Sequence, residues 1–529
     1  MSDERRDRSE RLPRRELLRR AAILAAAVPG AGAAFAAAPP SASLAAGAAP
    51  RRGGTLTVGL DSDATTLDPG YSTAEVDRQI YYGFFDGLVD VDAQLRIVPK
   101  LAVSWKPLND TTWEVKLRPG VRFHDGTVFD AQGAKANFDR ILDPKAGSPR
   151  RGEIPYVEAA EAVDAATLRL HLTGAFAPLP YSLSGFSGLM ISRAAIDKYG
   201  KDLASNPIGT GPFSFVRWLK GDHIDGKAFA DYWQKGRPYV DAIRYEGIPD
   251  PEVKANAVRS GTIDATENLL AKDTGALQHD SGLQMYARPG LSVASLRLQL
   301  AKPPFNNRAL REAIGWAVDR GAINRIVYYG IGAPARSFLP PTALGYDPAF
   351  NPFPQRDLVK AKAKLAEGGQ PHGFAVQVQI LNNPEIIQLA QAIKQQLADV
   401  GIDAQLVTLD NGTLLGRLVA ADFAASIITY FGTLDPFQGF SRFFLSTSKL
   451  NVYGYKSPEF DGLLAKAAAT ADAKARAALY SRMDRLVGTD LPWVFLRYPD
   501  YTEALRTRVQ GYTYIPDGGM RFTDAWLTS

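Results

Sequence analysis

The chain has 529 residues, of which 46% are hydrophobic, enough for a soluble protein with buried cores in two or three compact bodies. Its formal net charge is +5, but residues 1–36 contain eight Arg and five acidic residues, so the rest has 53 basic and 51 acidic side chains. A nearly neutral body argues against a nucleic-acid partner, which needs clustered positive charge. The sequence has no cysteine, which excludes disulfides, thiolate metal sites and a cysteine nucleophile.

The first 38 residues have the three-part pattern of an export signal with its cleavage region. A basic stretch at 13–20 precedes an apolar run at 21–28, which is much shorter than the roughly 20 residues that span a bilayer. The pair Arg14-Arg15 resembles a twin-arginine signal, and the lack of cysteine predicts that no lipid anchor is attached. Residues 39–54 are rich in Ala, Pro and Gly and are expected to form a flexible leader.

From Thr55 onward strand and helix patterns are mixed, which indicates an α/β fold. Alternating apolar residues predict strands at 55–60, 113–117 and 168–172. Helices are predicted wherever a side-chain acceptor directly precedes an amphipathic segment. The predicted N-cap residues are Asp130, Asp250, Asn383 and Ser457, the last three of which are followed by proline.

The residue patterns do not indicate an enzyme. The five histidines lie far apart in the sequence, so no pair has the close spacing of metal ligands. The stretch 184–189 lacks the last glycine of a G-x-S-x-G motif, and the turn at 209–212 lacks the third glycine of a dinucleotide fingerprint. We therefore expect no catalytic residues, no cofactor and no metal. A secreted hydrolase stays open as an alternative, because the separation of two carboxylates is a three-dimensional property.

Several segments together resemble the extracellular solute-binding protein family 5, which includes peptide-, nickel- and opine-binding receptors of ABC importers. They occur in the family's order over nearly the whole chain after residue 54, and none of them is a catalytic motif. The segments are Thr66–Pro69, Leu101–Trp105, Leu117–Gly126, Pro207–Phe213, Tyr232-Trp233, Pro303–Phe305, Val318–Arg320, Pro458–Asp461 and Asp490–Pro492.

The resemblance implies a two-lobed periplasmic-binding-protein fold of type II, in the large peptide-binding-like class, with an extra subdomain in lobe 1. On this expectation lobe 1 covers residues 55–294, lobe 2 covers residues 295–496, and residues 497–529 return to lobe 1. It also implies a monomeric, non-enzymatic periplasmic receptor that closes about a hinge on a small solute and delivers it to an inner-membrane ABC permease. A peptide chaperone or signalling receptor on the same fold is a further alternative.

The strand at 292–300 carries the first candidate contacts with a solute. Its polar face consists of Ser295, Arg297 and Gln299. The family usually has Asn at the position of Gln299 and a small or apolar residue at that of Arg297. Because an unpaired buried charge is costly, Arg297 is predicted to bind a ligand carboxylate or phosphate through its planar fork. The alternative is an exposed or internally paired arginine, for example with Glu267.

The loop at 429–436 carries a second group of candidates, Tyr430, Phe431 and Thr433. In peptide-binding members of the family, this loop holds an acid that pairs with the ligand's α-ammonium group, and this chain lacks that acid. The missing acid and the additional arginine favour an anionic or acylated solute, such as an opine-like compound or a blocked peptide.

Three further candidates come from two segments, of which the resemblance places the first, around the turn at 66–69, at the border of the cleft. Tyr71 and Ser72 follow the turn at 66–69. Asn382 directly precedes the N-cap residue Asn383 of a predicted helix, whose backbone N–H groups suit an anion. Helix capping explains Asn383 equally well.

Overall fold

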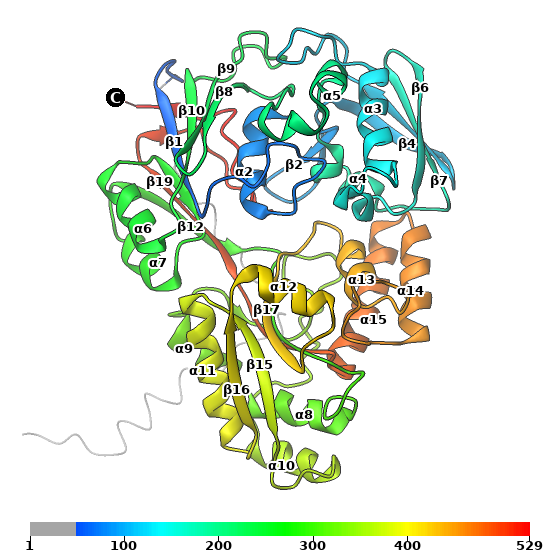
Figure 1. Cartoon of the computed structure of the whole chain (residues 1–529), viewed down its shortest axis with the longest axis vertical. Helices are drawn as coiled ribbons and strands as arrows, with labels where there is room; N and C mark the ends of the chain where they lie inside the picture. Colours follow the sequence, from blue (N-terminus) through cyan, green and yellow to red (C-terminus); the bar gives the residue numbers. More distant parts are fainter. Residues whose placement is uncertain (1–48, 529) are drawn as a thin grey trace, which may run out of the picture. The chain divides into compact units, whose positions relative to one another are not determined.

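The computed structural model describes residues 49–528, and its strands in this range form three larger sheets and two short ribbons (Figure 1). The first sheet has seven strands in the order β12-β19-β11-β1-β10-β9-β8. β1 runs parallel to β10 and β11, and the outer pairs are antiparallel. The strands are β1 (Thr55–Leu60), β8 (Phe213–Leu219), β9 (His223–Ala228), β10 (Ala242–Gly247), β11 (Ala265–Glu267), β12 (Leu283–Pro289) and β19 (Asp500–Arg506).

A four-stranded antiparallel sheet in the order β4-β5-β7-β6 forms an extra subdomain between β1 and β8 in the chain. Its strands are β4 (Ala102–Asn109), β5 (Thr112–Leu117), β6 (Val157–Asp164) and β7 (Thr167–Leu172). We call the two sheets, helices α2–α7 and the ribbons β2-β3 and β20-β21 lobe 1. The helices and ribbon strands are α2 (Glu75–Phe84), α3 (Ala131–Leu142), α4 (Leu179–Ser182), α5 (Arg193–Tyr199), α6 (Pro251–Ser260), α7 (Ala271–Leu277), β2 (Val89–Val91), β3 (Ile97–Pro99), β20 (Val509–Gln510) and β21 (Trp526–Leu527).

The third large sheet has six strands in the order β14-β18-β13-β17-β15-β16, and with helices α8–α15 it forms what we call lobe 2. Its strands are β13 (Val293–Leu298), β14 (Ala333–Pro334), β15 (Ala375–Leu381), β16 (Asp403–Leu409), β17 (Ala425–Tyr430) and β18 (Trp493–Tyr498). Its helices are α8 (Arg308–Ala317), α9 (Arg320–Val327), α10 (Leu358–Glu367), α11 (Pro384–Ala398), α12 (Asn411–Val419), α13 (Phe437–Phe443), α14 (Pro458–Ala469) and α15 (Ala473–Asp490).

The central strand β13 is buried on both faces, because helices cover both sides of the lobe 2 sheet. Leu296 and Leu298 belong to a core shared with α8, α9 and α11. Val293, on the opposite face, belongs to a core shared with α13–α15. Polar residues on this second face, Arg297 among them, are therefore enclosed by helices.

The predicted helix starts are confirmed. Asp130 accepts a hydrogen bond from Gly133 N at the start of α3, and Asp250 caps α6 through Glu252 N and Val253 N. Asn383 caps α11, and Ser457 caps α14. The predicted strands correspond to β1, β5 and β7. These elements could be predicted because caps and alternation are local features of the sequence.

The chain passes between the lobes at two places that lie next to each other in lobe 1, after β12 and before β19 (Figure 1). Residues 290–292 connect β12 of the seven-stranded sheet to β13 of the six-stranded sheet. Pro499 connects β18 to β19 in the return direction. The predicted lobe limits at 294/295 and 496/497 stay predictions.

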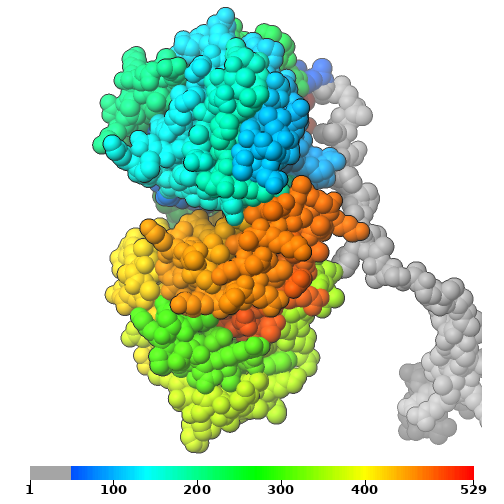
Figure 2. Space-filling view, turned by 90° about the vertical axis from the view of Figure 1, so that its right-hand side faces the viewer, coloured from blue at the N-terminus to red at the C-terminus, as the bar shows by residue number. Residues whose placement is uncertain are grey.

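The lobes also contact each other through α13 and α14. Gln438 Nε2 donates to Ser182 Oγ over 3.0 Å, and Ala177 N donates to Ala468 O over 2.7 Å. The ring of Phe437 lies 5.2 Å from that of Phe176. Figure 2 shows the orange surface of lobe 2 next to the blue and cyan surface of lobe 1.

Residues 1–48, which contain the predicted export signal and most of the predicted leader, lie outside the described residues. Among residues 49–528, no helix has both the length and the apolar character that a membrane crossing requires.

Candidate functional site

Arg297 lies in the middle of the lobe 2 sheet, opposite Ser426 of β17 and Trp493 of β18. Only 4% of its surface is exposed. Its guanidinium carbon lies 3.9 Å from the centre of the Trp493 ring and 5.3 Å from that of Phe443. Nη1 donates a hydrogen bond of 2.6 Å to the Tyr453 hydroxyl. Aromatic rings thus form a cage around this cation.

The cage contains no counter-charge for Arg297. Within residues 49–528 no carboxylate forms an ion pair with its guanidinium, and its Nε–H has no hydrogen-bond partner. The predicted alternative, an ion pair with Glu267, is not formed: Glu267 belongs to β11 of lobe 1 and accepts from Gln79 instead. Because a buried cation without a counter-charge is costly, the site favours an anion.

Gln299 follows the end of β13 and is engaged in the fold. Its Nε2 donates to Val452 O over 2.8 Å, and its Oε1 accepts from Ala301 N over 3.2 Å. Only 2% of its surface is exposed. The amide nitrogen therefore holds the loop that brings Tyr453 to Arg297, and the amide oxygen holds the turn after β13.

The loop after β17 holds its three candidates close together. Tyr430 stacks on Phe338, with ring centres 5.4 Å apart, and its hydroxyl is 3.4 Å from Thr433 Oγ1. Thr433 Oγ1 donates to Asp435 O over 2.9 Å. Phe431 is 49% exposed, the most open of the candidates on this loop. Tyr430 is thus held in place by Phe338, whereas the side chain of Phe431 is exposed.

This loop lies directly against the first crossing segment. A Cβ atom on Gly432 would fall 1.9 Å from the carbonyl oxygen of Leu291, so only glycine fits there. The neighbouring Ser292 Oγ donates to the Tyr501 hydroxyl of β19 over 3.0 Å. The two crossing segments and the candidate loop therefore meet at one place.

Tyr71 and Ser72 lie just before α2 in lobe 1. Tyr71 is 37% exposed, with the Arg140 guanidinium 5.4 Å from its ring centre. Ser72 is fully buried and donates to Asp77 Oδ2 over 2.7 Å, and Asp77 also accepts from Thr65. Burial raises the pKa of Asp77, and these hydrogen bonds oppose the increase. The Ser72 side chain thus stabilises the turn before α2, and the Tyr71 side chain is partly exposed on the surface of lobe 1.

Asn382 is exposed and lies beyond the carboxyl end of β15, where its backbone N–H donates to Leu409 O. The next residue, Asn383, uses its side chain to cap α11. No contact joins Asn382 to the other candidates among the described residues.

Charge effects on Tyr430 show which groups lie near one another. Burial raises the pKa of the Tyr430 hydroxyl, and the positive charges of Arg442 and Arg297 oppose this increase. The negative charge of Glu75, from α2 of lobe 1, adds to it. Glu75 also contributes to the raised pKa of Tyr501, which burial brings to about 12. The Tyr430 hydroxyl is therefore influenced by the charge of Arg297 from its own lobe and by that of Glu75 from lobe 1.

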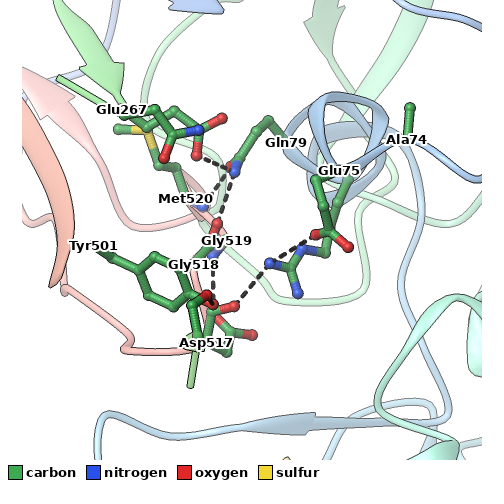
Figure 3. A network of polar contacts seen from close by, with 12 residues as sticks. Ala74, Glu75, Gln79, Glu267, Tyr501, Asp517, Gly518, Gly519 and Met520 are labelled. Carbon is green, nitrogen blue, oxygen red and sulfur yellow. Dashed lines mark hydrogen bonds and ion pairs between the residues drawn. The ribbon is translucent and has the colours of Figure 1, made fainter. Parts of the chain in front are cut away.

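The polar network around Glu75, shown in Figure 3, could not be found from sequence patterns. Glu75 forms an ion pair of 3.1 Å with Arg78, and Arg78 Nη2 donates to Asp517 O over 2.7 Å. Gln79 Nε2 donates to Gly518 O, and its Oε1 accepts from Met520 N. The spacing of Glu75 and Arg78 on one helix face was the available signal, but their partners come from the far end of the chain.

The arrangement is suited to binding. The cage offers a cation, N–H donors and aromatic surfaces from lobe 2, and lobe 1 offers Tyr71 and Glu75. Across the part of the chain that the structure describes, no group of three or more His, Asp or Glu is placed to hold a metal ion. His124 Nε2 donates to Gly211 O, its Nδ1 accepts from Gly209 N, and burial lowers the pKa of this histidine to about 4.

Two lobes joined by adjacent crossing segments, each with its own sheet, define the class of two-lobed periplasmic binding proteins, in which a solute lies between the lobes. A family model of the bacterial extracellular solute-binding proteins, family 5, matches residues 96–451, well over half of the chain. The chain belongs to this family. Its class is that of the substrate-binding proteins of ABC importers.

Relatives and solved structures agree with this assignment. The glutathione-binding protein GsiB of Escherichia coli K12 is 30% identical over 484 residues, covering 89% of this chain and 94% of that protein. The periplasmic binding protein DppA of Helicobacter pylori, in complex with the peptide STSA, has a TM-score of 0.81 at 27% identity and covers 90% of this chain and 99% of its own. The binding protein AgaA of A. tumefaciens R10, in complex with agropinic acid, has a TM-score of 0.80 at 27% identity, with the same coverage.

Proposed function

We propose that this protein captures a small anionic solute, opine-like or a peptide with a blocked amino end, and delivers it to an inner-membrane ABC permease. The observation that carries this proposal is Arg297, a buried cation with an aromatic cage and no carboxylate partner among the described residues. A ligand carboxylate would supply the counter-charge, and the planar guanidinium suits such a group.

The loop after β17 supports the same class of solute. Between Tyr430 and Asp435 it carries no acid, so lobe 2 offers no carboxylate at this loop for a free α-ammonium group. The two similar structures hold a peptide and agropinic acid, and the relatives in E. coli are named for glutathione. An acid with an apolar or acylated body fits a site that combines one arginine with the exposed ring of Phe431.

Capture is proposed to work through closure of the lobes. The crossing segments at 290–292 and Pro499 are short, so they allow a relative rotation about one place. A solute held by Arg297 and Tyr430 from lobe 2 and by Tyr71 from lobe 1 stabilises the closed form, because only that form offers both sets of contacts. The permease would then recognise the outer surface of the closed protein.

The proposal extends to the setting of the protein. Residues 1–38 would direct export, by the twin-arginine route, to the periplasm, without a lipid anchor. The mature protein would act as a monomer and return its solute unchanged, without catalysis. The six other candidate contacts are Gln299, Phe431, Thr433, Tyr71, Ser72 and Asn382, of which Phe431, Tyr71 and Asn382 are exposed.

A thermal-shift panel tests this function. The purified protein is melted with opine-like acids, N-acetylated peptides, free di- and tripeptides, oligosaccharides and nickel chelates. A solute at about 100 times its Kd stabilises the folded state by roughly 2.7 kcal/mol, which moves the midpoint by a few degrees. We expect a shift with the acids and blocked peptides, and its loss in Arg297→Ala.

The matched control is Arg325→Ala, which removes an exposed arginine of α9 in the same lobe. This variant should keep the full shift. A shift with free peptides alone, or an unchanged shift in Arg297→Ala, would contradict the proposed recognition. Recovery of the intact solute after denaturation separates a binding protein from a hydrolase.

A further inference from the structure

Two side chains in contact with each other in lobe 2 each have a buried N–H donor without a partner. One is Nε of Arg297, and the other is Nε1 of Trp493. Trp493 is fully buried and Arg297 is 96% buried. Buried donors are nearly always hydrogen-bonded, so a neighbouring pair without partners points to a group that belongs between them.

The strand register brings these donors together. Trp493 begins β18 and is paired with Arg297 of β13. The guanidinium carbon lies 3.9 Å from the centre of the indole ring, so the two planar groups are in contact. The donors therefore belong to touching side chains on adjacent strands, and their relative position is fixed by the sheet.

The aromatic side chains around Trp493 do not accept hydrogen bonds from these two donors. Phe338, Phe443 and Phe444 surround the Trp493 ring, with ring centres between 4.8 and 5.8 Å away, and none has a polar side-chain atom. The Tyr453 hydroxyl accepts from Arg297 Nη1, and Ser426, opposite Arg297 on β17, donates its hydroxyl to Gln379 O. Neither hydroxyl is a partner of Arg297 Nε or Trp493 Nε1, so both N–H groups stay without an acceptor among these side chains.

The chemistry of the donors defines that partner. An indole N–H only donates, and a guanidinium only donates and stays positive. A carboxylate has two oxygens with about four acceptor positions, so one such group can accept from both side chains and neutralise the arginine. A bound water molecule would accept from both but would leave the charge of Arg297 uncompensated.

We propose that Trp493 Nε1–H and the Arg297 guanidinium together bind one carboxylate-type group of the solute, which makes Trp493 a residue that determines specificity for acids. This inference deepens the proposed function and rests on it. Because Trp493 is 0% and Arg297 4% exposed, entry of the acid requires the aromatic side chains around them to move.

The test compares an acid with its own primary amide. Isothermal titration measures the Kd of the strongest acid from the panel and of its amide, for the wild type, Trp493→Phe and Trp316→Phe. Trp316 is the matched control, because it is a half-buried tryptophan on α8 in the other core of lobe 2. Trp493→Phe keeps an aromatic ring in the cage and removes the N–H.

We expect Trp493→Phe to weaken binding of the acid by about tenfold or more and binding of the amide by less than twofold, while Trp316→Phe changes neither. Equal weakening of acid and amide would mean that Trp493 only packs, and would overturn the inference. If Arg297→Ala weakens acid binding and Trp493→Phe does not, the inference fails and the proposed function stands. If neither variant weakens it, both fail.

A second measurement does not depend on a folded variant. The chain has seven tryptophans, so the ¹⁵N-labelled wild type has seven indole N–H signals. The signal of fully buried Trp493 should be the slowest to exchange with D₂O. It should shift downfield when the acid binds and stay in place with the amide. An unchanged signal at saturation with acid would contradict the inference, since a water molecule would then be the resident partner.

Discussion

Lobe 2 buries charged groups of both signs, and the two cases differ in what surrounds them. Arg297 keeps its charge in an aromatic cage that leaves one donor free. Asp484, on α15, is 1% exposed and accepts hydrogen bonds from Phe338 N and Leu339 N over 3.0 and 3.1 Å. Burial raises the pKa of Asp484 to about 7, although these hydrogen bonds act in the opposite direction. The arginine thus keeps one N–H donor without a partner, whereas the acid is held by the backbone.

The raised pKa of Asp484 gives a stability that depends on pH. Its ordinary pKa is 3.8, so between pH 4 and about 7 the folded state binds a proton that the unfolded state has released. Stability from this group therefore falls as the pH rises through that window, by up to about 4 kcal/mol. Asp484→Asn keeps the acceptor for both backbone N–H groups and removes the charge. We expect the difference between the unfolding midpoints, Asp484→Asn minus wild type, to increase steadily from pH 4.5 to 7.5.

Denaturant or thermal melts at five pH values check this expectation. Glu503 of β19, whose pKa is raised to about 8 by burial, titrates in both proteins, so its effect cancels in the difference. Parallel curves for wild type and Asp484→Asn would show that Asp484 does not titrate in this range.

The α13 segment is held to α15 by a single buried acid. Asp435 accepts from the Tyr480 hydroxyl over 2.5 Å, from Phe437 N over 3.0 Å and from Arg476 Nε over 3.3 Å. Both Asp435 and Arg476 are nearly fully buried. The acid therefore connects the loop after β17 to α15, which is a role in the fold and not in recognition.

Removing this acid should loosen the segment that touches lobe 1. Asp435→Ala leaves Arg476 buried without its counter-charge, which costs about 3–5 kcal/mol of stability. Asp435→Asn keeps acceptors for Tyr480 and Phe437 and should cost clearly less. Chemical denaturation of both variants measures this difference. Because both variants remove the negative charge, equal losses would show that the ion pair with Arg476 dominates and that the hydrogen bonds to Tyr480 and Phe437 contribute little.

Helices and strands could be predicted from the sequence where they are determined by residues close together in the chain. The capped starts of α3, α6, α11 and α14 were predicted at the observed residues. The alternation also placed Arg297 on the polar face of its strand. It could not predict that β18 inserts beside β13, because that pairing joins segments far apart in the chain. The contact of Arg297 with Trp493, and the network of Glu75 with Asp517, follow from such pairings.

At the scale of the whole molecule, the lobes are joined by residues 290–292 and Pro499 and touch again at α13 and α14. The lobe 2 loop at Gly432 lies against Leu291, close to the crossing segments. A change in the angle between the lobes would therefore change the surroundings of Tyr430 and Tyr71 together. If the protein closes on its solute as proposed, this coupling would allow the solute to favour one arrangement of the lobes over another.

Closure of the lobes on an acidic solute is the central claim, and a distance measurement tests it most directly. Because the chain has no cysteine, spin labels attach only where cysteines are introduced. The exposed residues Val216 of β8 in lobe 1 and Val359 of α10 in lobe 2 are suitable sites, as Val216→Cys and Val359→Cys in one chain. Double electron–electron resonance is recorded without solute, with the acid and with its amide. We expect the acid to shift the distance distribution to a shorter and narrower one at the concentration at which it binds; a distribution that stays unchanged at saturation would contradict the account.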